Sequence, residues 1–296
     1  MSDYSDLILG LKQGDFIAVA RSLTVVENEL AGSANLLRTI EVNQNIPVIG
    51  VTGPPGAGKS TLVNAMIDQL SVEGKKIAVI AVDPTSPFNL GSLLGDRIRM
   101  ATQFNKPNVF IRSVATRGSA GGLSAKIIEM NDVLKSANFD YIIVETVGVG
   151  QSEIEIAGLA DLTVVVLVPE AGDEIQHIKS GLMEIGDIFV VNKADRDGAD
   201  SFAGNLKKFF HQSSRSIPVL KTIADKNIGV NELVSVVKSA SLGNERRIFL
   251  YVEKAYRLIQ NHKMKDLKKT ELQMELNLAF NKEDFNLYKF IEAYLD

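Results

Sequence analysis

The sequence predicts an α/β fold in which a mostly parallel sheet is flanked by helices, with helical extensions at both ends of the chain. Two observations lead to this prediction. Short β-branched apolar runs recur between residues 47 and 223, and they are continuous rather than alternating, as in strands buried on both faces. Segments with helical periodicity separate these runs. Such alternation is typical of a parallel sheet with helices on both faces.

Residues 1–45 form the first predicted unit, an N-terminal helical segment. Apolar residues recur near a 3.6-residue period from Leu7 to Leu23 and again from Val25 to Ile40. No residue pattern in this segment points to chemistry. We interpret the segment as a helical layer packed on the domain that follows.

Residues 46–243 form the second predicted unit, which contains the sheet. The expected strands are Val48–Thr52, Ile77–Val82, Val109–Val114, Tyr141–Glu145, Thr163–Val168, Ile188–Asn192 and Val219–Ile223. The expected helices include Thr61–Leu70, Leu123–Leu134, Ile175–Glu184 and Val230–Ser239. Ligands of such sheets bind beyond the carboxyl ends of the strands, so the polar residues that follow each strand are the candidate site residues.

Residues 244–296 form the third predicted unit, a C-terminal helical extension. The apolar β-like runs stop near Asn244, and two helical patterns follow with a Lys-rich stretch between them. A basic binding patch and a solvated helix face both fit these lysines, and the solvated face is the better interpretation.

Composition limits the classes of function. Of the 296 residues, 32 are Lys or Arg and 36 are Asp or Glu, and the resulting net charge of −4 disfavours a dedicated nucleic-acid binder. Cysteine is absent, which excludes disulfides and catalytic thiols and agrees with a cytoplasmic location. The N-terminal residues lack a signal-peptide pattern, and no apolar run is long enough to span a bilayer. We therefore expect neither nucleic acid nor a membrane as a partner.

The strongest motif is the run GPPGAGKST at residues 53–61, which fits the pattern G-x-x-x-x-G-K-[ST]. It follows a predicted buried strand and opens a predicted helix, which is the context that a P-loop needs. Glycines let backbone N–H groups face phosphate oxygens, Lys59 reaches the β- and γ-phosphates, and the Ser60 hydroxyl can bind Mg²⁺. The predicted phosphate-binding residues are Gly53, Pro54, Pro55, Gly56, Ala57, Gly58, Lys59, Ser60 and Thr61.

A second motif, N-K-A-D at residues 192–195, follows the strand that begins at Ile188. In a P-loop protein an N-K-x-D motif at this place selects guanine. Asp195 can accept hydrogen bonds from guanine N1–H and the 2-amino group, and adenine offers no matching donors. The stem of Lys193 would cover the face of the base, and Asn192 would tie this loop to the phosphate loop. Backbone N–H groups of the next strand end would close over the base, from Thr222, Ile223 and Ala224.

Three carboxylates end or follow central strands, and they are candidate Mg²⁺-site residues: Asp83, Asp96 and Glu145. Magnesium prefers an octahedral shell of oxygen ligands, which these groups and the P-loop serine can supply. The run Glu145-Thr146-Val147-Gly148 is also similar to a DxxG turn, in which the Gly148 N–H would donate to the γ-phosphate. For each carboxylate a helix cap or a surface turn is the alternative.

A fourth polar segment, residues 169–179, leaves the end of another predicted strand. From the residues alone, two interpretations fit equally. The segment is either a mobile switch or a helix N-terminus with acidic capping.

With these motifs the chain resembles the MeaB/ArgK family of P-loop GTPases, which is grouped with the metallocentre-maturation GTPases. The resemblance covers about residues 5–245. The most specific runs are ETVGVGQSE from residue 145 and GDEIQHIKSG from residue 172. The other matching segments are ARSLT at residues 20–24, VDPTSP at 82–87, GDR at 95–97, RG at 117–118 and GG at 121–122.

The resemblance implies roles for residues. Ser60, Asp83, Asp96 and Glu145 are implied Mg²⁺ ligands, and Glu145 and Lys59 are the implied catalytic residues. The family uses the fourth polar segment as a switch that couples the nucleotide state to a mutase, which favours the switch interpretation for three residues of this chain: Asp173, Gln176 and Lys179.

The resemblance also implies a function, namely a GTP-hydrolysing chaperone for an adenosylcobalamin-dependent acyl-CoA mutase, chiefly methylmalonyl-CoA mutase. A cobalamin adenosyltransferase is a further implied partner, and homodimerisation through the C-terminal region is expected although that region is short here. No glutamine follows Gly148 directly, so we expect slow intrinsic hydrolysis of GTP to GDP and phosphate. Two alternatives remain: a metallochaperone GTPase for metalloenzyme maturation, and an ATP-dependent kinase of an amino-acid transport system.

Overall fold

The structure is a computed structural model of the whole chain. It describes residues 4–83, 100–115, 126–146, 152–172, 181–212, 216–240 and, further on, residues 248, 251–252, 255–256, 258–260, 263–264, 267, 269–280 and 285–294. These residues fall into two compact units, Met1–Arg247 and Ile248–Asp296.

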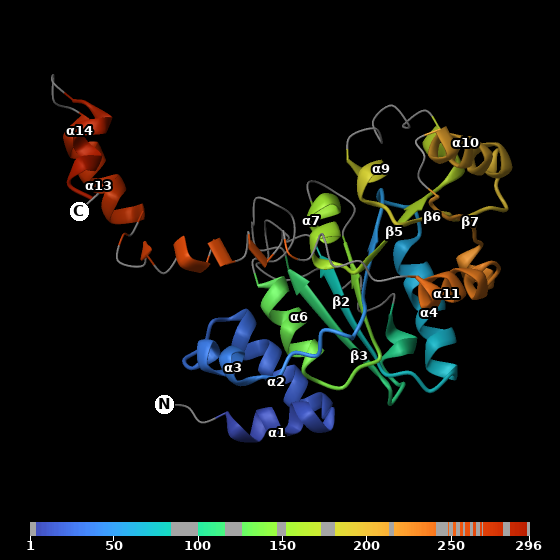
Figure 1. Cartoon of the computed structure of the whole chain (residues 1–296), viewed down its shortest axis with the longest axis horizontal. Coiled ribbons are helices and arrows are strands. Elements are labelled where there is room, and N and C mark those ends of the chain that lie inside the picture. Colours follow the sequence, from blue (N-terminus) through green and yellow to red (C-terminus); the bar gives the residue numbers. More distant parts are fainter. Residues whose placement is uncertain are drawn as a thin grey trace. The chain divides into compact units, whose positions relative to one another are not determined.

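The first unit is built on a seven-stranded sheet with the order β3-β2-β4-β1-β5-β6-β7, in which every neighbouring pair is parallel (Figure 1). The strands are β1 Val48–Thr52, β2 Ile77–Asp83, β3 Val109–Ala115, β4 Tyr141–Glu145, β5 Leu162–Leu167, β6 Ile188–Val191 and β7 Val219–Lys221. All five residues of β1 and all six of β5 are buried, as their continuous apolar sequence predicts. The predicted α/β class is confirmed.

Helices cover both faces of the sheet (Figure 1). One face packs on α4 Lys59–Val72 and α11 Val230–Ser239. On the other face, the half with β1 to β4 is covered by α1 Ser5–Gln13, α2 Phe16–Glu27, α3 Ser33–Thr39, α6 Ile127–Lys135 and α7 Ser152–Leu159. The half with β5 to β7 is covered by α9 Leu182–Ile185 and α10 Ala199–Gln212. Short 3-10 turns η1 Ala101–Gln103, η2 Pro169–Gly172 and η3 Ala224–Lys226 complete this unit.

The strand order places a topological switch beside β1. The chain passes from β1 to β2 on one side and from β4 to β5 on the other, and β1 lies between β4 and β5. In parallel sheets the crevice outside the carboxyl ends of the strands at such a switch is where ligands bind. The loop between β1 and α4 starts at this point.

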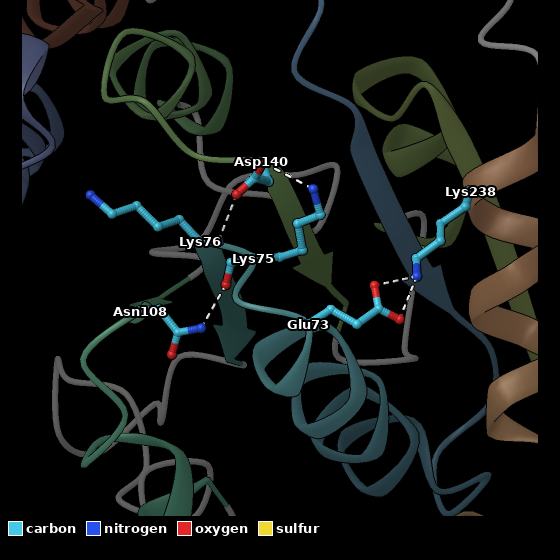
Figure 2. Close-up of polar contacts among 6 residues, drawn as sticks. All are labelled: Glu73, Lys75, Lys76, Asn108, Asp140 and Lys238. Carbon is cyan, nitrogen blue, oxygen red and sulfur yellow. Dashed lines mark hydrogen bonds and ion pairs between the residues drawn. The ribbon is translucent and has the colours of Figure 1, made fainter.

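The amino edge of the sheet is held by structural contacts (Figure 2). The backbone N–H of Lys76, just before β2, donates to Asp140 Oδ2 at 2.8 Å, and Asn108 donates to a carbonyl of the same turn. Glu73 at the end of α4 pairs with Lys238 of α11. These contacts fix the turns that enter β2, β3 and β4, and they leave the carboxyl edge for the polar groups of the site.

The second unit contains α13 Lys269–Phe280 and α14 Leu287–Glu292. Ring contacts connect the two helices, with centroid distances of 5.3 Å for Phe280–Phe285 and 6.5 Å for Phe285–Phe290. None of the residues of α14 is buried, and several large apolar side chains are exposed, among them Met274, Leu278 and Tyr288. In the described part of the chain no helix combines the length and the hydropathy that a membrane crossing needs.

The predicted strand and helix bounds hold within a few residues where the structure describes them, with two differences of note. The last strand ends at Lys221 rather than Ile223, because Ile223 leaves the sheet to form an antiparallel bridge with Ile228. Of the helix predicted at Ile175–Glu184, only the final turn lies within the described residues, as α9.

Candidate functional site

The loop between β1 and α4 has the backbone that its glycines predict. Gly53, Gly56 and Gly58 have φ values of 137°, 76° and 86°, which side chains with a Cβ rarely adopt. A Cβ on Gly53 would lie 2.0 Å from the carbonyl oxygen of Val166 in β5, so this position excludes any side chain. The loop therefore turns tightly over the end of the sheet and passes directly into the N-terminus of α4, which favours an anion.

Lys59 lies inside this loop. It is 6% exposed, and its Nζ donates to the carbonyl oxygens of Gly53 at 2.8 Å and Pro54 at 3.1 Å. The ammonium group is thus held at the mouth of the loop, at the N-terminus of α4. This is the position from which a P-loop lysine neutralises phosphate charge.

Ser60 and Glu145 meet at the carboxyl end of β4. The Ser60 hydroxyl donates to Glu145 Oε1 at 2.6 Å, and Glu145 is 5% exposed. The register that pairs Val51 of β1 with Glu145 of β4 brings them together across 85 residues of sequence. The two groups place hard oxygen donors side by side next to the phosphate loop, and such a donor set fits Mg²⁺.

A hydroxyl contact reinforces this strand pair one step further along. Thr146 Oγ1 donates to Thr52 Oγ1 at 3.0 Å, and the Thr146 N–H donates to the carbonyl oxygen of Val51 at 3.0 Å. Both threonines are buried. The end of β4 is therefore fixed against the start of the phosphate loop.

Asn192 connects the phosphate loop to the two loops predicted to hold the base. Its Nδ2 donates to the carbonyl oxygen of Ala57 at 2.9 Å. Its Oδ1 accepts from the Thr222 hydroxyl at 3.0 Å and from the Ala224 N–H at 3.2 Å. The side chain is 2% exposed, so these hydrogen bonds form away from water. The structure thus contains the expected tie between this motif and the phosphate loop.

Lys193, the next residue, also reaches the phosphate loop. Its backbone has a φ of 55°, and its Nζ donates to the carbonyl oxygen of Gly56 at 2.7 Å. The side chain therefore spans from the N-K-A-D loop to the phosphate loop, as a stem that covers a base between them would.

Asp195 is half exposed and pairs with Lys226, whose Nζ lies 3.1 Å from Asp195 Oδ2. This hydrogen bond, together with one from the backbone N–H of Asp195 itself, holds the pKa of the Asp195 carboxyl below its ordinary value. An aspartate is ionised at neutral pH even at its ordinary pKa, and these contacts favour the same charged form, which is the hydrogen-bond acceptor that guanine N–H groups need.

A second ion pair lies beside it. Arg196 pairs with Glu170 of η2, which links the N-K-A-D loop to the segment after β5. The pKa of Glu170 lies below its ordinary value, first because a backbone N–H of its own residue donates to the carboxylate and then because Arg196 does.

Several predicted site residues lie outside the described residues: Asp96, Gly148, Asp173, Gln176 and Lys179. Asp83 ends β2 at the same edge of the sheet as Glu145, and only its backbone is described. Among the described residues no group of three His, Asp or Glu side chains lies close enough together to hold a metal ion. Mg²⁺ beside a phosphate loop needs fewer, because phosphate oxygens and waters complete its shell.

Sequence reasoning missed two charged residues of this site, Arg196 and Lys226, and it placed Glu170 in the polar segment 169–179 without a partner. One signal was available, since Arg196 directly follows the N-K-A-D motif and Lys226 comes two residues after the predicted base-closing segment. No spacing rule, however, states which partner a long charged side chain selects.

Comparison with known proteins places the chain in a family. The family model described as "Methylmalonyl Co-A mutase-associated GTPase MeaB" matches residues 19–269. The chain belongs to the MeaB family. It is therefore a P-loop GTPase, in agreement with the resemblance seen in its motifs.

Relatives from distant organisms are similar to the chain. The Pyrococcus horikoshii protein named as the GTPase PH0274 is 47% identical over 246 residues, which cover 80% of this chain and 78% of that protein. GTPase ArgK of Escherichia coli is 35% identical over 302 residues, covering 96% and 88%. The mouse protein named methylmalonic aciduria type A homolog, mitochondrial, is 38% identical over 207 residues, covering 64% and 50%.

A solved structure shares the fold. The crystal structure of a protein named LAO/AO transport system kinase is 28% identical in sequence and superposes with a TM-score of 0.68, covering 98% of this chain and 95% of that one. The fold of this MeaB-family chain is thus that of a P-loop nucleoside triphosphatase.

Proposed function

We propose that this MeaB-family GTPase is a chaperone for an adenosylcobalamin-dependent acyl-CoA mutase, most directly methylmalonyl-CoA mutase, which it protects or loads with its cofactor. The observation that carries the GTP-dependent part is the buried set of Asn192 hydrogen bonds, which joins a phosphate-binding loop to a guanine-type base loop. The family description, which names the mutase, supports the partner.

In this proposal the protein binds GTP and hydrolyses it to GDP and phosphate by positioning and by neutralising charge. Lys59 offsets charge on the β- and γ-phosphate oxygens from its place inside the loop. The backbone N–H groups of the loop and the N-terminus of α4 act on the same oxygens. Glu145, buried beside Ser60, orients or polarises the attacking water.

A bound Mg²⁺ ion would neutralise charge that builds up on the phosphate oxygens during transfer. Ser60 and Glu145 would hold it, together with Asp83 and Asp96 by resemblance, and their oxygen donors fit this ion. Asp195 accepts from guanine N1–H and the 2-amino group, Lys193 covers the base, and the N–H groups that follow β7 close over it, from Thr222, Ile223 and Ala224. Gly148 donates to the γ-phosphate.

Coupling to the mutase is assigned to the segment with Asp173, Gln176 and Lys179. The pair between Arg196 and Glu170 supports this assignment, because it connects the base loop to the residues that lead into the segment. We place the protein in the cytoplasm, without nucleic acid or membrane as a partner, and with a cobalamin adenosyltransferase as a further partner of the complex.

We also propose a homodimer formed through residues 244–296. The exposed apolar side chains of α13 and α14 support it, since a second copy would remove them from water. Analytical ultracentrifugation of the full chain tests this point, and a monomer at micromolar concentration would contradict it.

The central test is the rate of GTP hydrolysis with and without methylmalonyl-CoA mutase. We expect slow turnover by the chain alone and faster turnover with the mutase, and equal rates would refute the coupling. Lys59→Ala serves as the inactive variant, and it should lose most of its GTP affinity because the phosphate charge is no longer offset. An exposed lysine of α10, Lys208, mutated to Ala serves as the control that keeps wild-type behaviour.

A second candidate function is an ATP-dependent kinase of an amino-acid transport system. The observation that favours it is the shared fold with the solved protein named LAO/AO transport system kinase. A nucleotide competition assay separates the two candidates. ATP that competes as well as GTP would support the kinase, and a strong preference for GTP would support the GTPase chaperone.

A further inference from the structure

Lys226 lies next to the group that would choose the base, and neither the motifs nor the comparisons assign it a role. We propose that Lys226 is a positioning residue for Asp195, which it holds in the orientation that accepts two hydrogen bonds from guanine. This inference rests on the proposed GTP-binding function and adds a residue that determines its specificity.

The turn that carries Lys226 is built rigidly. Lys226 is the last residue of η3, and Ile223 and Ile228 on either side of the turn exchange backbone hydrogen bonds at 3.0 and 3.2 Å. Asn227 has a left-handed φ of 56°, and a Cβ on Gly229 would lie 2.2 Å from the carbonyl oxygen of Lys221. These features fix the backbone position of Lys226.

The same turn is fixed relative to Asp195. The Ala194 N–H donates to the carbonyl oxygen of Thr222 at 3.0 Å, and the Ala224 N–H donates to Asn192 Oδ1 at 3.2 Å. Residues 192 and 194, in the loop of Asp195, are therefore hydrogen-bonded to residues 224 and 222, which lead into the turn of Lys226. The two backbones therefore keep a fixed separation, and across it Lys226 Nζ lies 3.1 Å from Asp195 Oδ2.

A count of hydrogen bonds shows why this pairing suits guanine. An ionised carboxylate offers about four lone-pair positions. Lys226 uses one of them, on Oδ2. Guanine brings two donors, its N1–H and 2-amino groups, and the remaining positions can accept both. Lys226 thus leaves room for the base and restricts the rotation of the carboxylate toward it.

An alternative is that Lys226 competes with the base for Asp195. In that case loss of the ammonium would strengthen the binding of GDP. The positioning role makes the opposite prediction, because a carboxylate that rotates freely must be ordered when the base binds.

The experiment measures dissociation constants of GDP, ADP and XDP for the full chain by calorimetry. For Lys226→Met we expect GDP to bind about three- to fivefold more weakly, as loss of an exposed ion pair gives, with ADP unchanged. Lys226→Arg should restore GDP binding to within about twofold of the wild type. The difference between Lys226→Met and the wild type should shrink between about 0.05 M and about 1 M salt, because salt screens an exposed pair.

The chain offers a matched control. Lys221, on the strand that leads into the same turn, forms an exposed ion pair with Asp200 of α10. Lys221→Met removes the same charge without contact to Asp195, and we expect it to leave all three dissociation constants unchanged. Circular dichroism verifies that each variant is folded.

A double-mutant cycle distinguishes positioning from a general effect of Lys226 on the fold. Asp195→Asn should prefer XDP to GDP. Xanthine carries a carbonyl oxygen in place of the 2-amino group of guanine, and the NH2 group of the asparagine can donate to that oxygen. In that background Lys226→Met should no longer weaken binding, since the carboxylate that it positions is gone. Weakening of XDP binding by the full three- to fivefold would overturn the inference.

The outcomes separate the two levels of the argument. If the wild type binds GDP and ADP equally, or if Asp195→Asn does not prefer XDP, the guanine assignment fails and the inference fails with it. If the wild type selects GDP but Lys226→Met binds it as well as or better than the wild type, the inference alone is wrong.

Discussion

Asn192→Ala removes the side chain that joins the phosphate loop to the base loops, and its cost can be worked out from the structure. The amide makes three hydrogen bonds, with Ala57, Thr222 and Ala224, at distances of 2.9 to 3.2 Å. All three partners are buried, at 0%, 0% and 4% exposure. Water therefore has little access to the groups that the substitution would leave.

Each buried hydrogen bond contributes about 1 kcal/mol net, so the three together contribute about 3 kcal/mol. For a domain of this size that corresponds to a fall of roughly 6–12 °C in the melting temperature. Affinity for GDP should fall as well, because the two loops lose the group that holds them in register.

The stability of the ligand-free protein is measured by thermal and by urea unfolding, and circular dichroism monitors both transitions. Thr222→Val is the graded comparison, since it removes one of the three hydrogen bonds and should cost about 1 kcal/mol. Asn231→Ala is the matched control, because Asn231 is exposed on α11 and its loss should change stability by less than about 0.5 kcal/mol.

Equal melting temperatures and urea midpoints for Asn192→Ala and Asn231→Ala would refute this prediction. Such a result would mean that the loops hold their places without the amide. If Thr222→Val were as costly as Asn192→Ala, the estimate of one contribution per hydrogen bond would be wrong, although the importance of the network would stand.

Two further predictions concern backbone and charge. Gly58→Ala should destabilise the protein by more than Gly74→Ala. Both glycines have a positive φ, 86° and 76°, and this backbone conformation costs an alanine about 1–2 kcal/mol. Only at Gly58 would the added Cβ also meet a neighbouring atom, Asn192 Nδ2 at 2.4 Å. Equal urea midpoints would contradict this. Because Lys226 holds the pKa of Asp195 below its ordinary 3.8, the carboxylate loses its charge only below that pH, so the preference for GDP over ADP should be constant from about pH 5 to 8. A preference that declines toward pH 5 in binding titrations would show that the carboxylate titrates in that range.

The strands could be predicted from the sequence because a strand buried on both faces has a distinctive pattern. Val48–Thr52 and Tyr141–Glu145 are found with the bounds that their apolar runs gave. Their adjacency could not be predicted, since β1 pairs with β4 and β5 and not with β2, which follows it in the chain. Strand order depends on how the whole sheet packs, and the apolar pattern within a single strand carries no information about it. The contact between Ser60 and Glu145 depends on that order.

Contacts of short side chains in the site could be predicted from the sequence, whereas contacts of long side chains could not. The tie from Asn192 to the phosphate loop could be predicted, because a short amide at the end of a strand has few partners within reach. The pairs of Lys226 and Arg196 could not, since long flexible side chains reach several partners and their choice depends on where other loops lie. The strand end at Lys221 was also missed, because the bridge between Ile223 and Ile228 needs a turn that the residue pattern of this segment does not predict.

Buried hydrogen bonds join the two halves of the site, and this has a consequence for the proposed choice of base. The amide of Asn192 and the carbonyl of Ala57 are 135 residues apart in sequence, yet their hydrogen bond is buried and its network is shared with the turn after β7. In the proposed function this network would hold the two loops in place before a nucleotide binds, which lowers the entropy cost of binding. In the proposed function the phosphate loop would then fix where a purine ring lies relative to Asp195. Guanine selectivity would depend on this fixed separation as much as on the carboxylate itself, because a well-placed acceptor discriminates only if the base cannot move away from it.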